Sequence, residues 1–117
     1  MEETRTKRPI SITILGWLYL AVGVFGTGEY YLQFTLQRPT ISEIVWITVL
    51  GVAAIVAGVF MLRGQGWARW LALAWMAAHV AISAFHSRQE VIIHSALLVL
   101  FGYLLLRRAA REYFGGA

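Results

Sequence analysis

Residues 67–94 read WARWLALAWMAAHVAISAFHSRQEVIIH, and this stretch decides the fold class that we predict. It consists of an apolar run, a short polar turn and a second apolar run, which is the pattern of two antiparallel helices. Three of the five tryptophans of the chain fall in it, and so do all three histidines, His79, His86 and His94. The stretch therefore predicts a helical hairpin that carries the only imidazole groups of the protein.

The composition of the whole chain extends this prediction to a membrane protein. Hydrophobic residues make up 59% and charged residues 14% of the 117 residues, whereas charged residues make up about 25% of an average soluble protein. A soluble domain of this length has too little interior to hide so much apolar surface. The chain contains no cysteine, which excludes disulfide bonds and thiolate metal sites. We therefore expect a single transmembrane domain over residues 1–117.

Four apolar runs are long enough to be membrane helices, since about 20 residues cross the hydrocarbon core of a bilayer. The first run is longer than the core of a signal peptide, so we expect it to be retained. A first helix that continues to about Phe34 is the alternative to one that ends with the apolar run, and Pro39 is expected to interrupt any helix beyond it. The predicted fold is all-α, a four-helix transmembrane bundle with up-down-up-down topology and short loops. Its helices are expected at residues 10–28, 43–62, 67–85 and 91–106, with basic tails at 1–9 and 107–117.

The basic residues predict the orientation of this bundle, because cytoplasmic segments carry an excess of lysine and arginine. With the N-terminus in the cytoplasm, the outer loops contain only Arg38 and Arg88. The cytoplasmic segments then contain Arg5, Lys7, Arg8, Arg63, Arg69, Arg107, Arg108 and Arg111. Both termini are therefore expected in the cytoplasm. The net charge of +4 then reflects membrane orientation, and no nucleic-acid partner is expected.

Two of the apolar runs are similar to each other. Residues 12–25 read ITILGWLYLAVGVF and residues 47–60 read ITVLGVAAIVAGVF. Each run contains two glycines seven residues apart, which places both on one helix face, where small residues allow helices to approach closely. These glycines are Gly16, Gly23, Gly51 and Gly58. We expect a shared role in helix packing, with an ancient internal repeat as the alternative.

The hairpin histidines are candidate metal ligands. His79 and His94 are expected at similar depths on facing helices, which is how helix bundles build metal and haem sites. His86 lies two turns beyond His79, and Glu90 lies one turn before His94. The predicted set is therefore His79, His86, Glu90 and His94, for a transition metal or haem. Structural hydrogen bonds across the helices are the interpretation that we favour for these residues, and metal or haem binding and the handling of a proton or ligand are the alternatives.

A second candidate set lies in the motif RGQGWARW, residues 63–70, at the cytoplasmic boundary. Tryptophan rings favour the water–lipid interface, and arginine side chains pair with lipid headgroups. Arg63, Trp67, Arg69 and Trp70 are therefore the predicted lipid-headgroup contacts.

Two motifs carry a resemblance to known proteins. RPISITIL, residues 8–15, precedes the first helix, and GQGWAR, residues 64–69, precedes the third. With these motifs the chain resembles a group of small bacterial four-helix inner-membrane proteins of uncharacterised function. The resemblance covers most of the chain and implies a multi-pass protein of the bacterial inner membrane. It brings no catalytic residue.

The sequence contains no nucleophile elbow, phosphate loop or dinucleotide-binding glycine pattern. We therefore predict a non-enzymatic packing or accessory module without a cofactor, which self-associates or binds a larger membrane partner. The first alternative is a histidine-ligated metal or haem protein. The second is a small homodimeric transporter, which would need a polar cavity near Glu29 and His79.

Overall fold

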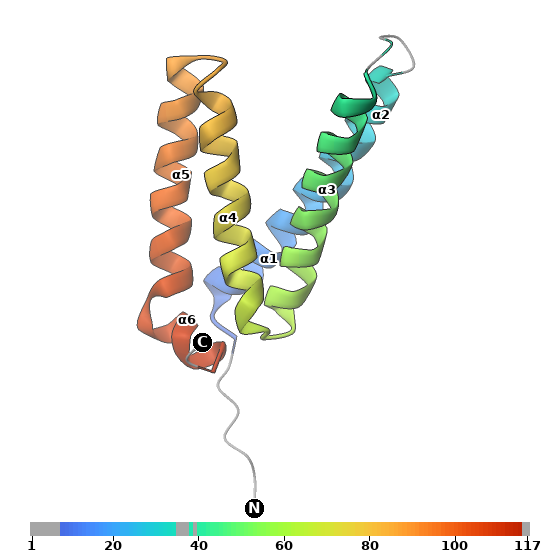
Figure 1. Cartoon of the computed structure of the whole chain (residues 1–117). Helices are drawn as coiled ribbons and strands as arrows, with labels where there is room; N and C mark the ends of the chain where they lie inside the picture. The colour runs from blue at the N-terminus through green and yellow to red at the C-terminus, as the bar shows by residue number, and fades with distance from the viewer. Residues whose placement is uncertain (1–7, 35–37, 39, 116–117) are drawn as a thin grey trace, which may run out of the picture.

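The structure, a computed structural model, describes residues 8–34, 38 and 40–115 (Figure 1). Every regular element of this part of the chain is a helix, which confirms the all-α class. In chain order the elements are α1 (Ile10–Ala21), the π-helical segment η1 (Val22–Gly26), α2 (Thr27–Phe34), α3 (Ile41–Leu62), α4 (Gly66–Ser83), α5 (Arg88–Leu106) and α6 (Arg108–Tyr113).

The first helical segment is longer than the apolar run at residues 10–28 and has the later of the two predicted ends. α1, η1 and α2 follow one another without a break, so the helix extends to Phe34 and not to residue 28. The prediction followed the apolar run, but the more polar residues 29–34 continue the helix. Pro39, the predicted helix breaker, lies outside the described residues, as do residues 1–7 of the N-terminal tail.

α3 and α5 begin earlier than predicted, because a hydroxyl side chain caps each N-terminus. The Oγ1 of Thr40 accepts a hydrogen bond from the backbone N–H of Glu43 at 3.2 Å. The Oγ of Ser87 accepts one from the backbone N–H of Glu90 at 3.1 Å. Both glutamates then lie in the first helical turn, where the helix dipole favours a carboxylate.

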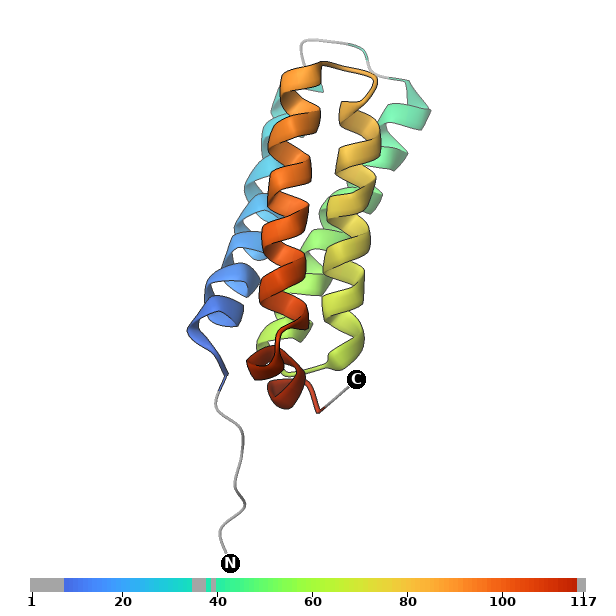
Figure 2. The same cartoon turned by 90° about the vertical axis from the view of Figure 1, so that its left-hand side faces the viewer.

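The C-terminal tail contains a docked helix, α6, where a loose end was expected. Ala110 and Phe114 are buried. The hydroxyl of Tyr113 lies 2.9 Å from the carbonyl oxygen of Met61 and 3.0 Å from that of Leu62. These contacts hold α6 beneath the end of α3, on the same side of the molecule as the α3–α4 turn (Figure 2).

The helices form two pairs that meet at one end and diverge at the other, so the fold is an open wedge (Figure 1). α1, η1 and α2 pack along α3, and α4 packs along α5. α4 also contacts α3, and α1 contacts α5. The buried core comprises Ile12, Leu15, Tyr19, Ala54, Ala57, Met61, Ala68, Ala72, Met76, Phe101, Leu105, Ala110 and Phe114. The bundle predicted from the sequence is therefore open at the end that contains α2 and the α4–α5 turn.

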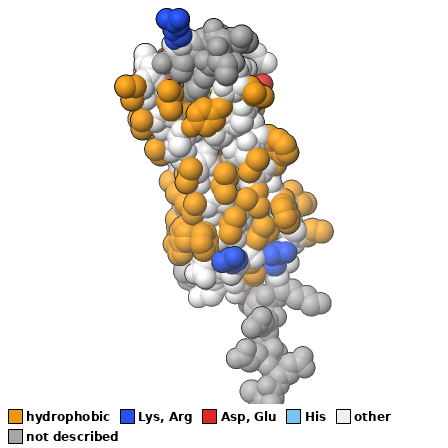
Figure 3. Space-filling view, turned by 90° about the vertical axis from the view of Figure 1, so that its right-hand side faces the viewer, with side chains coloured by type: hydrophobic (Ala, Val, Ile, Leu, Met, Phe, Trp, Pro, Cys, Tyr) orange, Lys and Arg blue, Asp and Glu red, His pale blue; other side chains and the backbone are white. Residues whose placement is uncertain are grey.

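The chain is a small multi-pass membrane protein by helix length and hydropathy. Three described helices are long and apolar enough to cross a membrane, namely Ile10–Gln33, Ile41–Leu62 and Arg88–Leu106. Hydrophobic side chains cover the face in Figure 3, with basic side chains near each end. α4 is not among these three helices, because Arg69 and His79 lower its mean hydropathy. A fourth span is therefore a proposal, taken up below.

The glycines of the two similar runs lie at the contact between α1 and α3. A methyl group added to Gly58 would lie 2.6 Å from the backbone oxygen of Gly16, and one added to Gly16 would lie 2.6 Å from the side chain of Leu62. A methyl group added to Gly23 would lie 2.9 Å from the backbone oxygen of Gly51. The predicted packing role is therefore confirmed, and the packing partner is the other helix of the same chain.

Candidate functional site

The candidate site is the cleft between the two arms of the wedge. Its open mouth is a cavity of about 540 Å³ between α2, α3 and α4. A second cavity of about 250 Å³ continues toward the joined end and shares several lining residues with the first. A third, of about 310 Å³, lies between α1 and the α4–α5 pair and shares Val22, Trp75 and His79 with the second. We refer to these three neighbouring cavities together as the cleft.

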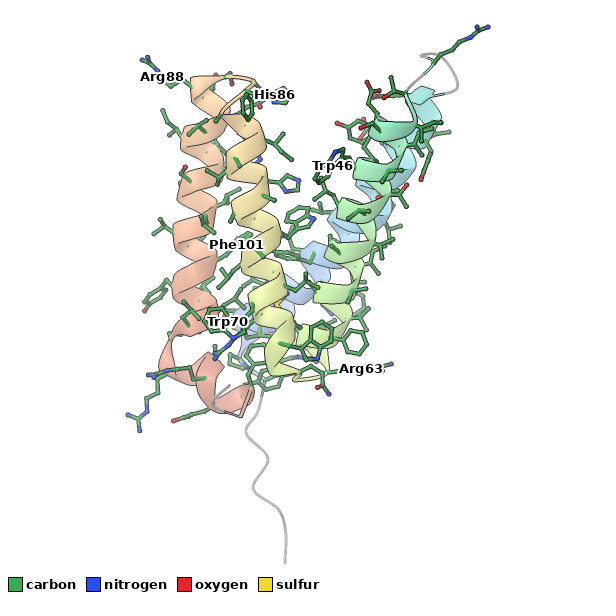
Figure 4. The ribbon with its side chains drawn as sticks, in the orientation of Figure 1. Trp46, Arg63, Trp70, His86, Arg88 and Phe101 are labelled. Carbon is green, nitrogen blue, oxygen red and sulfur yellow. The ribbon has the colours of Figure 1, made fainter. Side chains whose placement is uncertain are left out.

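Helix periodicity explains which residues line the cleft. Side chains three or four positions apart share one face of a helix, so each wall is a stripe of regularly spaced residues. The stripe of α4 comprises Trp75, His79 and Ile82, and His86 of the turn after α4 continues this wall. The stripe of α3 comprises Glu43, Trp46, Ile47 and Leu50. Trp46 projects from α3 toward the other arm (Figure 4).

Aromatic side chains close the deep end of the cleft. The ring centroid of Tyr19 lies 5.2 Å from that of Trp75 and 6.0 Å from that of Phe101. The indole N–H of Trp75 donates a hydrogen bond to the carbonyl oxygen of Leu50 at 2.8 Å. The hydroxyl of Tyr19 donates one to the carbonyl oxygen of Ala72, also at 2.8 Å. These bonds tie α4 to both α1 and α3, and they fix the depth at which the arms separate.

His79 and His94 face each other across the α4–α5 pair, with ring centroids 6.1 Å apart. The Nδ1 of His79 lies 2.9 Å from the carbonyl oxygen of Trp75, and the Nδ1 of His94 lies 2.8 Å from that of Glu90. A carbonyl oxygen only accepts hydrogen bonds, so each Nδ1 carries the hydrogen. Each Nε2 then keeps its lone pair, as in histidines that bind metals.

Ser83 supports the same assignment of protons. Its Oγ lies 2.7 Å from the carbonyl oxygen of His79 and 2.7 Å from the Nδ1 of His94. The hydroxyl donates its single proton to the carbonyl, so the oxygen accepts the N–H of His94. A hydrogen bond across the two helices, which was the structural interpretation of these histidines, is therefore present at His94.

His86 and Glu90 do not join the His79–His94 pair. His86 is exposed at the tip of the hairpin, with its Nδ1 2.9 Å from the carbonyl oxygen of Ile82 (Figure 4). α4 ends at Ser83, so the predicted two-turn spacing from His79 to His86 is interrupted. Within the described residues, no group of three or more histidine, cysteine, aspartate or glutamate side chains lies close enough to hold a metal ion. The four predicted ligands are therefore not one cluster.

The structure separates the four predicted lipid-headgroup residues. Arg63, Trp67 and Trp70 are exposed, whereas Arg69 keeps only 3% of its accessible surface. The Nη1 of Arg69 donates a hydrogen bond to the carbonyl oxygen of Leu105 at 3.2 Å. Arg69 lies on the inner face of the first turn of α4, so it anchors α4 to the end of α5. The expectation of a headgroup contact is corrected for this residue.

Sequence reasoning missed the wall of the cleft that α2 and α3 supply. A first helix that ends at residue 28 places Tyr30 in a loop, although it lines the mouth of the cleft. Glu43 and Trp46 share one face of α3, and their spacing of three is visible in the sequence. That spacing does not tell which face of α3 looks toward α4, so it was not sufficient to predict the wall.

The π-helical segment η1 also lies along the cleft. Val22, Gly23 and Gly26 line the second cavity opposite Trp75 and His79. π-helical turns are rare in proteins, and those that do occur are often found at functional sites. Their position here agrees with the choice of the cleft as the candidate site.

Comparisons of the chain with models of protein families, with curated proteins and with solved structures found no match.

Proposed function

We propose that this chain is a non-enzymatic module of the membrane that binds another membrane component in its cleft. The wedge itself carries the proposal, because two helix pairs are joined at one end and held apart at the other, with cavities between them. The glycine pattern that would otherwise offer a surface to a neighbouring helix is used within the chain, between α1 and α3. The cleft, in contrast, is a concave surface with side chains from both arms.

The proposal includes four spans, with both termini in the cytoplasm of a bacterium. The α3–α4 turn with Arg63 and the helix α6 with Arg108 and Arg111 lie at the joined end of the wedge (Figure 1). The first turns of α3 and α5, with Glu43 and Glu90, lie at the open end. This distribution agrees with a cytoplasmic joined end. α4 is then a less apolar span shielded between α3 and α5, and the cleft opens toward the outer leaflet. The motifs in residues 8–15 and 64–69, which resemble those of small bacterial inner-membrane proteins, support the choice of membrane.

Photo-crosslinking in native membranes tests this function. With p-benzoylphenylalanine in place of Trp46, which is 62% exposed at the cleft, we expect one adduct of defined mass. The matched control places the same residue at Val99, which is 72% exposed on α5 outside the cleft, and should give only diffuse lipid adducts. Intact-protein mass spectrometry separates a second copy of the chain, another protein and a small amphiphile.

A variant that fills the cleft tests whether the adduct forms inside it. Ile82 lines both outer cavities, so Ile82→Trp is expected to abolish the adduct at position 46 by occupying the space. Identical adducts at positions 46 and 99, or an adduct that survives Ile82→Trp, would contradict the proposed function.

A metal- or haem-binding protein is the second candidate, and the His79–His94 pair supports it. Both Nε2 atoms are free to coordinate, and the Nδ1–H groups are held by backbone carbonyls, as the second shell of a metal site requires. Two imidazoles are few for a structural site. A metal ion here would therefore take its other ligands from solvent, a substrate or a partner.

We expect a metal-binding protein to show stoichiometric metal or a haem absorption band after purification in mild detergent. His79→Ala and His94→Ala should each remove the signal, because each removes half of the protein ligands. His86→Ala is the control, since His86 lies outside the pair. Visible spectroscopy and metal analysis by mass spectrometry give the readout. Metal that persists in both pair variants would contradict this candidate.

The transporter alternative receives less support. It needs a polar cavity near Glu29 and His79, but Glu29 is absent from the described residues that line the cavities around His79. Those residues are mainly apolar or aromatic. We therefore do not propose transport.

A further inference from the structure

The mouth of the cleft combines aromatic walls with a carboxylate. Tyr30 from α2 and Trp46 from α3 line it and are 49% and 62% exposed. Glu43 lies one helical turn before Trp46 on the same face of α3 and lines the same cavity. Aromatic faces attract cations through the ring quadrupole, and a nearby carboxylate adds charge attraction. These are the groups that recognise organic cations.

Positive side chains are missing from this part of the cleft. The described residues that line the mouth include no lysine or arginine. Within the described part of the chain, the one ion pair joins Arg108 and Glu112 at the opposite end. Arg88 begins α5 and points away from the wedge (Figure 4). The carboxylate of Glu43 therefore gives the mouth a negative charge that favours a cationic ligand.

The cleft becomes apolar below this mouth. Ile47, Leu50 and Ile82 line both the mouth and the second cavity, so an apolar chain would pass between them. At the mouth itself, the Nδ1 of His86 lies 2.9 Å from the carbonyl oxygen of Ile82, so this side of the ring is directed to the backbone. The polarity of the lining therefore changes along the cleft in the same sense as the polarity of an amphiphile.

We propose that the cleft binds an amphiphilic organic cation, with its charged head at Glu43, Tyr30 and Trp46 and its apolar chain directed toward the joined end. The proposal rests on the proposed function, because it names the component that occupies the same cleft. A zwitterionic phospholipid fits less well, since its phosphate would lie beside the Glu43 carboxylate. The volume of the mouth, about 540 Å³, is in the usual range for small-molecule sites.

Binding of dodecyltrimethylammonium to the full chain in dodecyl maltoside micelles tests the proposal by isothermal titration calorimetry. Saturable binding of one molecule per chain is expected. Octaethylene glycol monododecyl ether has the same chain and an uncharged head, and it should show no saturable binding. Equal binding of the two probes would overturn the proposal, because the charge would then not contribute.

Two pairs of matched variants locate the site. Glu43→Gln is expected to weaken binding about fivefold, and Trp46→Leu by a similar factor. Glu29→Gln removes a carboxylate of the same arm that does not line the mouth, and Trp17→Leu removes an exposed tryptophan outside the cleft. Both controls should bind as the parent chain does. Weakening that is equal in Glu43→Gln and Glu29→Gln would overturn the proposed site.

The outcome also distinguishes this inference from the proposed function. If the cationic probe fails to bind while position 46 still gives a defined adduct, the cleft has an occupant of another class and only this inference is overturned. Such an occupant would be identified if phosphatidylethanolamine stays bound to the parent chain in native mass spectrometry but is lost in the Ile82→Trp variant. If position 46 gives no defined adduct either, both proposals are overturned.

Discussion

Replacing Gly58 by alanine is expected to lower the free energy of unfolding by about 2–3 kcal/mol, in the upper part of the roughly 1–3 kcal/mol that overpacking costs. The added methyl group would lie 2.6 Å from the backbone oxygen of Gly16, and 3.0 Å from the backbone nitrogen of Leu20. Backbone atoms cannot rotate out of the way as a side chain can, so α1 and α3 must separate. Reversible unfolding in mixed dodecyl maltoside and sodium dodecyl sulfate micelles, followed by circular dichroism, measures the change.

Gly102 provides the control for this substitution. It also lies inside a membrane helix, α5, but a methyl group added there would meet nothing within 4 Å. Alanine is the better helix former by about 1 kcal/mol, so Gly102→Ala should leave stability unchanged or raise it. The two substitutions are chemically identical, but only Gly58→Ala is expected to destabilise the protein. A neutral Gly58→Ala would show that α1 and α3 do not pack at these glycines.

Replacing Arg69 by alanine is expected to cost about 2 kcal/mol, because a hydrogen bond from a charged donor to the carbonyl oxygen of Leu105 is lost. The guanidinium also lies 5.7 Å from the ring centroid of Phe114, which is 4% exposed. Loss of this contact should release α6 from the joined end. A single cysteine at position 110, which is buried on α6, reports the release, since the chain has no other cysteine. Maleimide labelling there should be faster in the Arg69→Ala background.

Arg63→Ala is the matched control, since the sequence predicts the same headgroup role for both arginines. Arg63 is exposed, and its guanidinium lies 5.7 Å from the ring centroid of Phe60. Its removal should change stability by less than about 0.5 kcal/mol, as is usual for surface positions. Equal losses in the two variants would mean that Arg69 is no more anchored than a surface arginine.

The sequence predicted the local properties of the chain well. Helix class, the approximate spans and the role of the four glycines follow from hydropathy and spacing, which belong to each helix by itself. The ends of the helices were less accurate, because Thr40 and Ser87 cap helices that begin before the apolar residues do. Likewise, residues 29–34 extend the first helix beyond its apolar run.

The candidate site was predicted only in part. The sequence placed His79 and His94 at one depth on neighbouring helices, and their rings are 6.1 Å apart. It also placed His86 on the face of His79, which required α4 to continue beyond Ser83. The proposed cation site was missed, because Glu43 and Tyr30 come from helices whose rotation toward α4 is set by contacts far away in the chain.

The sequence by itself therefore determined that this is an all-α, multi-pass membrane protein. The hydropathy of a segment is a sum over its own residues, so it does not depend on which other helices the segment contacts. Only the tertiary structure decided that the two helix pairs diverge into a wedge, that the cleft is lined by α2, α3 and α4, and that Arg69 is buried while Arg63 is exposed. These features depend on which face of each helix meets another. Close contacts determine which helix faces pack together, such as those of Gly58 with Gly16 and of Tyr113 with the end of α3.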